Sequence, residues 1–216
     1  MDNKVWDFDS WAKSYDVSVR DGNWIHESYD QTLELVTSKV VERVKWRNQS
    51  MLDIGAGTGN LESLLTGCQG LSITAIEPSA SMREKFSQKH PTLKVLPGNI
   101  PDGLPEFEEK FDIITSTYVV HHVPFDQLEK MIKSLCDILN NDGLVIIIDP
   151  MFESAQFRDE HIEQLKRNGC NELAEEIEDE FFHSVAEVRA CFEKLGFEVE
   201  ASRLTFYVWM VQAKRH

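Results

Sequence analysis

The residues best suited to chemistry in this chain are three glycines and one acid that follow apolar runs. Gly55, Gly57 and Gly59 come directly after the apolar run 51–54. Glycine permits a tight turn and a close approach of backbone to ligand, and a following helix points free N–H groups at the same space. Glu77 ends the next apolar run, where a carboxylate can accept hydrogen bonds from both hydroxyls of a ribose. The pattern predicts a nucleoside-binding turn, with GxGxG rather than the GxGxxG spacing of dinucleotide-binding turns.

A second candidate group lies in STYVVHHV, residues 116–123. His121 and His122 are candidates for a general base, because imidazole titrates near neutral pH. We expect no metal site here, since the side chains of adjacent residues at a strand end point to opposite sides.

Strands and helices that alternate along the chain are expected to position these residues. Ser81 with Glu84 predicts a capping box at one helix start, and an Asn-Asp-Gly turn precedes residue 144. Such alternation predicts an α/β fold, with a parallel sheet between two layers of helices. The predicted strands are 51–54, 71–76, 93–96, 111–116 and 144–149, and the predicted helices are 60–66, 80–89 and 128–139.

Two segments fall outside this alternation. Apolar residues at helical spacing between 33 and 44 predict one packing helix. Residues 151–183 predict two helices inserted after the fifth strand, with the acidic run 175–180 on a solvated face. A capping box at Ser184 and Glu187 then starts a last helix, which Gly196 ends. Residues 197–200 and 205–213 predict a final antiparallel strand pair.

Composition limits the classes of partner. Asp and Glu outnumber Lys and Arg by 37 to 22 in 216 residues, a formal charge of −15. This charge repels nucleic acid and anionic lipid. The four cysteines show no zinc spacing, and no signal peptide or membrane span is apparent, so a cytoplasmic protein with reduced cysteines is expected.

The segments DIGAGTGN and IEPS resemble those of class I S-adenosylmethionine-dependent methyltransferases. With WAKSYD and STYVVHHV, they are most similar to the small bacterial YrrT-like members, and the resemblance covers nearly the whole chain. It implies a Rossmann-like seven-stranded sheet, mostly parallel with an antiparallel last strand. In one domain, residues 1–49 would form an N-terminal helical lid, 50–150 the cofactor-binding core, 151–183 a helical cap, and 184–216 the last helix and strand pair.

The resemblance also implies a role for individual residues. Asp53 would help to hold the methionine amino group, Glu77 the ribose, and Asn99 the adenine amino group. Met82 could cover the adenine, and Tyr15 would lie over the methionine end, although Trp11 and Tyr15 could equally pack on one helix face. The implied cofactor-binding residues are Tyr15, Asp53, Gly55, Ala56, Gly57, Gly59, Glu77, Pro78, Met82, Asn99, Ile100, Ser116 and Thr117.

Within the same resemblance, Thr117 and Tyr118 would line the methyl site, and one histidine of the pair is commonly structural. The function expected is methyl transfer from S-adenosylmethionine to a small molecule. Three alternatives are a non-catalytic cofactor-binding protein, an NAD-dependent oxidoreductase and an RNA methyltransferase. Neither the acceptor atom nor the oligomeric state follows from the sequence.

Overall fold

A computed structural model describes residues 8–21, 23–100 and 103–215. Within these residues, seven strands form one sheet in the order β3-β2-β1-β4-β5-β7-β6. All neighbouring pairs are parallel except β5 with β7 and β6 with β7. Residues 1–7 of the predicted lid lie outside the described residues. The strands are β1 Gln49–Ile54, β2 Leu71–Ile76, β3 Lys94–Leu96, β4 Phe111–Thr117, β5 Leu139–Pro150, β6 Phe197–Arg203 and β7 Val208–Arg215.

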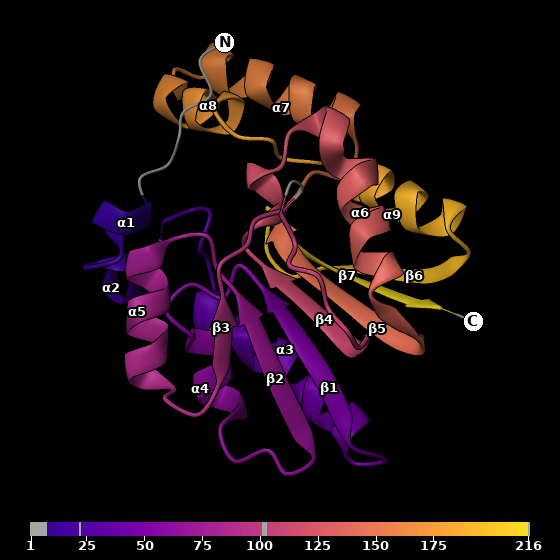
Figure 1. Cartoon of the computed structure of the whole chain (residues 1–216). Coiled ribbons are helices and arrows are strands. Elements are labelled where there is room, and N and C mark those ends of the chain that lie inside the picture. Colours follow the sequence, from indigo (N-terminus) through magenta and orange to yellow (C-terminus); the bar gives the residue numbers. More distant parts are fainter. Residues whose placement is uncertain (1–7, 22, 101–102, 216) are drawn as a thin grey trace.

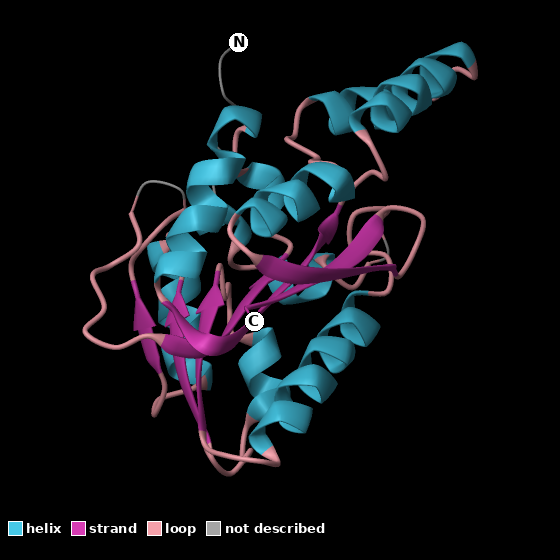
Figure 2. Ribbon diagram, turned by 90° about the vertical axis from the view of Figure 1, so that its right-hand side faces the viewer, coloured by secondary structure: helices cyan, strands magenta, loops and turns pink. Residues whose placement is uncertain are grey.

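Helices cover both faces of this sheet (Figures 1 and 2). The longer ones are α3 Tyr29–Val44, α4 Asn60–Leu65, α5 Ala80–Lys89, α6 Leu128–Asp137, α7 Ala155–Arg167, α8 Asn171–Glu178 and α9 Val185–Lys194, with short α1 Phe8–Trp11 and α2 Tyr15–Ser18 and the 3-10 turns η1 Val120–His122 and η2 Phe125–Gln127. No helix of the described ranges combines the length and apolarity that crossing a bilayer requires.

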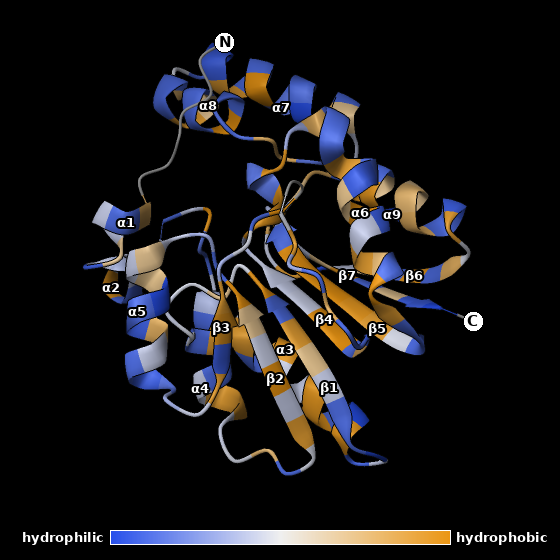
Figure 3. Ribbon diagram, viewed as in Figure 1, coloured by the Kyte–Doolittle hydropathy of each residue, from blue (hydrophilic) through white to orange (hydrophobic). Residues whose placement is uncertain are grey.

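The core is divided between the two faces because successive strand residues point to opposite sides. Met51 and Ile113 pack against α3 and α4 on one face. Leu52 and Ile114 pack against α6 and α9 on the other. The strands are therefore apolar on both sides, as in a covered parallel sheet, and Figure 3 shows polar residues on outward parts of α5 and α7.

The insert after β5 has a small core of its own. Phe152, Ile177 and Phe182 are buried there, with Trp24 and Tyr207 packed against them. The Trp24 indole N–H also donates to the Glu176 carboxylate at 2.6 Å. These contacts join the insert to the segment before α3, above the carboxyl ends of the strands (Figure 1).

Several local predictions were wrong. Helix α6 ends at Asp137, and Leu139 begins β5 because it pairs with Phe111 of β4. Ser79, not Ser81, caps α5, accepting from the Met82 N–H at 3.1 Å.

The last strand begins at Val208 rather than at residue 205. In contrast, Ser184 and Glu187 form the predicted capping box, and Gly196 has the left-handed conformation typical of a helix stop, with φ +81°.

Candidate active site at the carboxyl ends of the strands

The glycine turn between β1 and α4 uses backbone conformations that favour glycine. Gly55, Gly57 and Gly59 have φ of +71°, +56° and +82°, which side chains disfavour. A Cβ on Gly55 would lie 2.3 Å from the Val119 side chain. The N–H groups of Gly55 and Ala56 both donate to the Ile76 carbonyl, at 2.8 and 3.0 Å. These hydrogen bonds hold the turn against the end of β2. The turn lies beside the boundary between β1 and β4, where the strand order reverses, and ligands bind at such boundaries in sheets of this kind.

Glu77, which follows β2, stabilises the turn through hydrogen bonds. Its two carboxylate oxygens accept from the Gly57 N–H at 2.9 Å and the Ser79 N–H at 2.8 Å. The side chain is buried, and this burial raises its pKa despite both hydrogen bonds. Since a carboxylate oxygen has two lone pairs, each oxygen can accept one further hydrogen bond.

Asp53, at the end of β1, lies under the turn. It accepts from the Thr115 hydroxyl at 2.5 Å, and burial raises its pKa to about 6. Glu62, in the first turn of α4, is fully buried close by. Glu62 was missed by the sequence analysis, although an acid inside the apolar pattern of Leu61 and Leu65 was a usable signal.

The N-terminal segment crosses the turn. The Tyr15 ring lies over Gly57, 3.5 Å from where a Cβ would stand, and 4.9 Å from the Trp11 ring, centre to centre. The two aromatic residues belong to separate short helices, not to one helix face as the alternative interpretation required.

Two acids anchor this segment. Asp16 accepts from the Thr58 hydroxyl and from the Asn60 amide. Asp9 accepts from the Ser79 hydroxyl at 2.6 Å and from the Ser81 N–H at 2.9 Å. Helices α1 and α2 therefore lie beside α4 and α5, as Figure 1 shows for α1 and α5.

Four of the predicted cofactor-binding residues follow β2 and β3, with Met82 inside α5. Met82 and Ile100 are buried, whereas Pro78 is exposed. Asn99 exchanges two backbone hydrogen bonds with Gly103, at 3.3 and 2.8 Å. Part of this loop, residues 101–102, lies outside the described residues.

A second cluster forms where β4 and β5 end, around Asp149. One Asp149 oxygen accepts from the Val119 and Val120 N–H groups, both at 2.8 Å. The other accepts from the His121 N–H at 3.2 Å and contacts His121 Nδ1 at 2.8 Å. Burial would lower the pKa of His121, but the Asp149 charge and hydrogen bond outweigh it and raise the pKa. Because Nδ1 faces Asp149, Nε2 is the nitrogen left for another partner.

His122 has a different environment. Its Nδ1 lies 3.3 Å from Glu180, and burial with repulsion from His121 lowers its pKa. The prediction that residues 175–180 are a solvated face was wrong for Glu180, which is 8% exposed. The two histidine rings lie 3.9 Å apart on η1, so the expectation that they point to opposite sides was also wrong, because the chain turns there.

Three predicted residues at the end of β4 have contrasting surroundings. Within the described chain, the buried hydroxyl oxygens of Ser116 and Thr117 find no hydrogen-bond partner. Tyr118 is not brought to this group. Its left-handed backbone, φ +59°, directs the phenol to Thr32 of α3 at 3.4 Å, and burial raises its pKa.

His26 is a further residue that the sequence analysis missed. Its ring centre lies 5.0 Å from that of Tyr118 and 6.3 Å from that of Trp11. Burial and the nearby His121 lower its pKa to about 4. A single histidine between two predicted segments carried no sequence signal of this contact.

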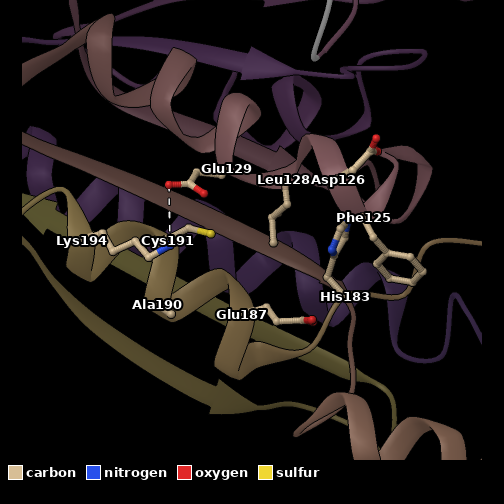
Figure 4. Close-up of a pocket in the computed structure, with 9 residues that line it drawn as sticks. All are labelled: Phe125, Asp126, Leu128, Glu129, His183, Glu187, Ala190, Cys191 and Lys194. Carbon is tan, nitrogen blue, oxygen red and sulfur yellow. Dashed lines mark ion pairs between the residues drawn. The ribbon is translucent and has the colours of Figure 1, made fainter.

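A separate pocket of about 340 Å³ lies between α6 and α9 (Figure 4). Phe125, His183 and Cys191 are among the residues that line it, and a 3.6 Å ion pair joins Lys194 to Glu129 across it. It contains none of the predicted site residues.

Comparison with known proteins decides the family. A family model described as a methyltransferase domain matches residues 26–202. The chain belongs to the class I S-adenosylmethionine-dependent methyltransferases. An uncharacterized methyltransferase of Oceanobacillus iheyensis is 34% identical over 212 residues, and the match covers 96% of this chain and 95% of that protein.

Two further similarities agree with this family. The uncharacterized methyltransferase YrrT of Halobacillus halophilus is 29% identical, with 96% of this chain and 95% of that protein covered. Magnesium protoporphyrin IX methyltransferase of Synechocystis PCC 6803, solved with S-adenosylhomocysteine, has a TM-score of 0.73 at 18% identity, covering 97% of this chain and 96% of that one. The predicted fold and family are therefore confirmed, and the oxidoreductase alternative is excluded.

Proposed function

We propose that this methyltransferase transfers the methyl group of S-adenosylmethionine to a small-molecule acceptor at the carboxyl ends of β1, β2, β4 and β5. The observation that carries the proposal is the pairing of Glu77 with the glycine turn. It supports a nucleoside site in which Glu77 accepts from the ribose hydroxyls and Asp53 faces the methionine end.

The described residues fit this cofactor. Glu77 and the Asp53–Glu62 pair place carboxyl groups around the turn, which suits a ligand with a sulfonium and an ammonium group. The Ser116 and Thr117 hydroxyls provide polar atoms that lack partners in the described chain. Tyr15, over Gly57, would cover the methionine end, and the buried Met82 and Ile100 would border the adenine with Asn99.

The cofactor supplies an activated methyl group, so the chain's main task is to position the acceptor. Alignment of the reactants can lower the barrier by roughly 7–11 kcal/mol. An acceptor that arrives protonated also needs a base. His121 is the better placed histidine, since Asp149 orients its ring and stabilises its protonated form.

A small acceptor is supported by what surrounds the β4 and β5 ends. The N-terminal segment and the insert contact each other through Trp24 and Glu176, so both could roof the acceptor site. The charge of −15 disfavours a nucleic acid. A cytoplasmic location fits the four free cysteines.

An S-adenosylhomocysteine-release assay tests the proposal. A panel of small thiols, amines and carboxylates is offered with S-adenosylmethionine, beside an RNA pool of equal concentration. Turnover with one small class is the expected result. Turnover with RNA alone would contradict the small-molecule acceptor. Binding of S-adenosylmethionine with no turnover on any acceptor would favour the non-catalytic alternative.

A further inference from the structure

Glu62 is the most unusual buried group near the cofactor site. It lies in the first turn of α4, its side chain is 0% exposed, and no other residue donates a hydrogen bond to either of its oxygens within the part of the chain that the structure describes. An ionised carboxylate without a donor is costly to bury. A protonated carboxyl group is not, provided that its O–H finds an acceptor.

Asp53 is that acceptor. Its side chain shares a hydrogen bond with that of Glu62, and the Thr115 hydroxyl also donates to it, at 2.5 Å. Burial raises the pKa of both acids, and the Asp53 charge raises that of Glu62 further. Two interacting carboxyl groups away from water titrate as a pair and hold one proton between them.

The pair lies where the cofactor's amino acid end is expected. Asp53 is two residues before Gly55, and Glu62 is three residues after Gly59. Glu77 is close enough to raise the pKa of Asp53. A cation bound at this turn would be attracted by the second negative charge that the pair gains when its shared proton leaves.

We propose that Glu62 is a positioning residue of the cofactor site: it shares one proton with Asp53 in the free protein, and the pair releases this proton to solvent when the cofactor's ammonium group binds. The inference rests on the proposed function. It adds to it a carboxyl group that fixes the orientation of Asp53, and a coupling of cofactor affinity to pH.

Other titratable groups surround the pair and must be separated from it. Glu77 faces it from β2, and Lys89 faces it from α5 and favours the ionised Glu62. His90 contacts the Gly59 carbonyl at 2.7 Å. The remaining groups near the turn are Tyr15 and Asp16 of α2 and Tyr29 of α3. All of them are retained when Glu62 alone is changed, so the difference between variants isolates the pair.

Calorimetry tests the proton directly with two ligands. S-adenosylhomocysteine carries the ammonium group, whereas 5′-methylthioadenosine lacks the amino acid end. Between about pH 6 and 7.5, below the titration of an amino group, release of one proton predicts about tenfold tighter S-adenosylhomocysteine binding per pH unit. Binding of 5′-methylthioadenosine should change little. This comparison needs only the wild-type protein.

Variants provide the second arm. Glu62→Gln keeps a donor to Asp53 but has no proton to release, so S-adenosylhomocysteine binding should lose its pH dependence. Glu200→Gln, an exposed change on β6, should keep the wild-type slope.

Equal slopes for the two ligands, or a wild-type slope in Glu62→Gln, would overturn the shared proton and leave methyl transfer untouched. Failure of the wild-type protein to bind S-adenosylhomocysteine at any pH would overturn the proposed function and this inference together.

Discussion

Removal of the Glu77 carboxylate should damage both the glycine turn and cofactor binding. The carboxylate accepts from the Gly57 and Ser79 N–H groups, at 2.9 and 2.8 Å, in a buried setting. An unpaired buried donor costs about 1–3 kcal/mol, so Glu77→Ala should lower the free energy of unfolding by about 2–6 kcal/mol. For a chain of this length, each kcal/mol shifts Tm by roughly 2–4 °C.

Glu77→Gln distinguishes the two roles. The amide keeps one acceptor oxygen for one of the two backbone N–H groups. Its NH2 group faces the other N–H group and cannot accept from it, so the free energy of unfolding should fall by about 1–3 kcal/mol, the cost of one unpaired donor. Glu77→Ala should bind S-adenosylhomocysteine at least tenfold more weakly, since a hydrogen bond to a charged group contributes about 1.5–3 kcal/mol, and Glu77→Gln should lose less affinity.

Denaturant unfolding and calorimetry measure these two quantities, and Glu84→Ala, an exposed acid on α5, is the matched control. If Glu77→Ala kept both the wild-type Tm and the wild-type affinity, the assigned role of this carboxylate would be refuted.

Three further predictions follow from the described geometry. Gly55→Ala should lower the free energy of unfolding more than Gly67→Ala does. Both substitutions cost about 1–2 kcal/mol for a left-handed backbone, but only a Cβ at Gly55 would meet a side chain. Equal losses of unfolding free energy in urea denaturation would contradict this. Burial lowers the pKa of His26 to about 4 in the folded protein, whereas its ordinary pKa is ~6.5. As pH falls from about 6.5 to about 4, the unfolded chain takes up a proton that the folded protein does not, so the free energy of unfolding should fall by up to about 3 kcal/mol. His26→Phe should flatten that part of the pH–stability curve, and an unchanged curve would refute the assignment. S-adenosylhomocysteine should protect residues 10–20 and 151–183 from hydrogen exchange, and equal exchange with and without it would count against a lid.

Much of the fold could be predicted from the sequence because its signals are local. Strand and helix periods predicted the alternation, and β2 and α5 have the predicted bounds. The glycines of the turn are needed for positive φ at their own positions, and the chain order places Glu77 at the next strand end. Where a tertiary contact competes with local preference, prediction failed: Leu139 had helical spacing, but pairing with Phe111 made it strand.

The composition of the site was decided by tertiary structure. Asp149 and His121 are 28 residues apart, and His122 and Glu180 are 58 apart, so no local pattern could pair them. Tyr118 and His121 stand in one motif, yet a left-handed backbone directs Tyr118 to α3. The protonation of Glu62 and Asp53 likewise depends on burial and mutual distance, which arise only when α4 packs onto the sheet. The sequence alone predicted which residues could hold a nucleoside, whereas the packed structure decided which acids and histidines share one low-dielectric environment, because that environment forms only when distant segments pack together.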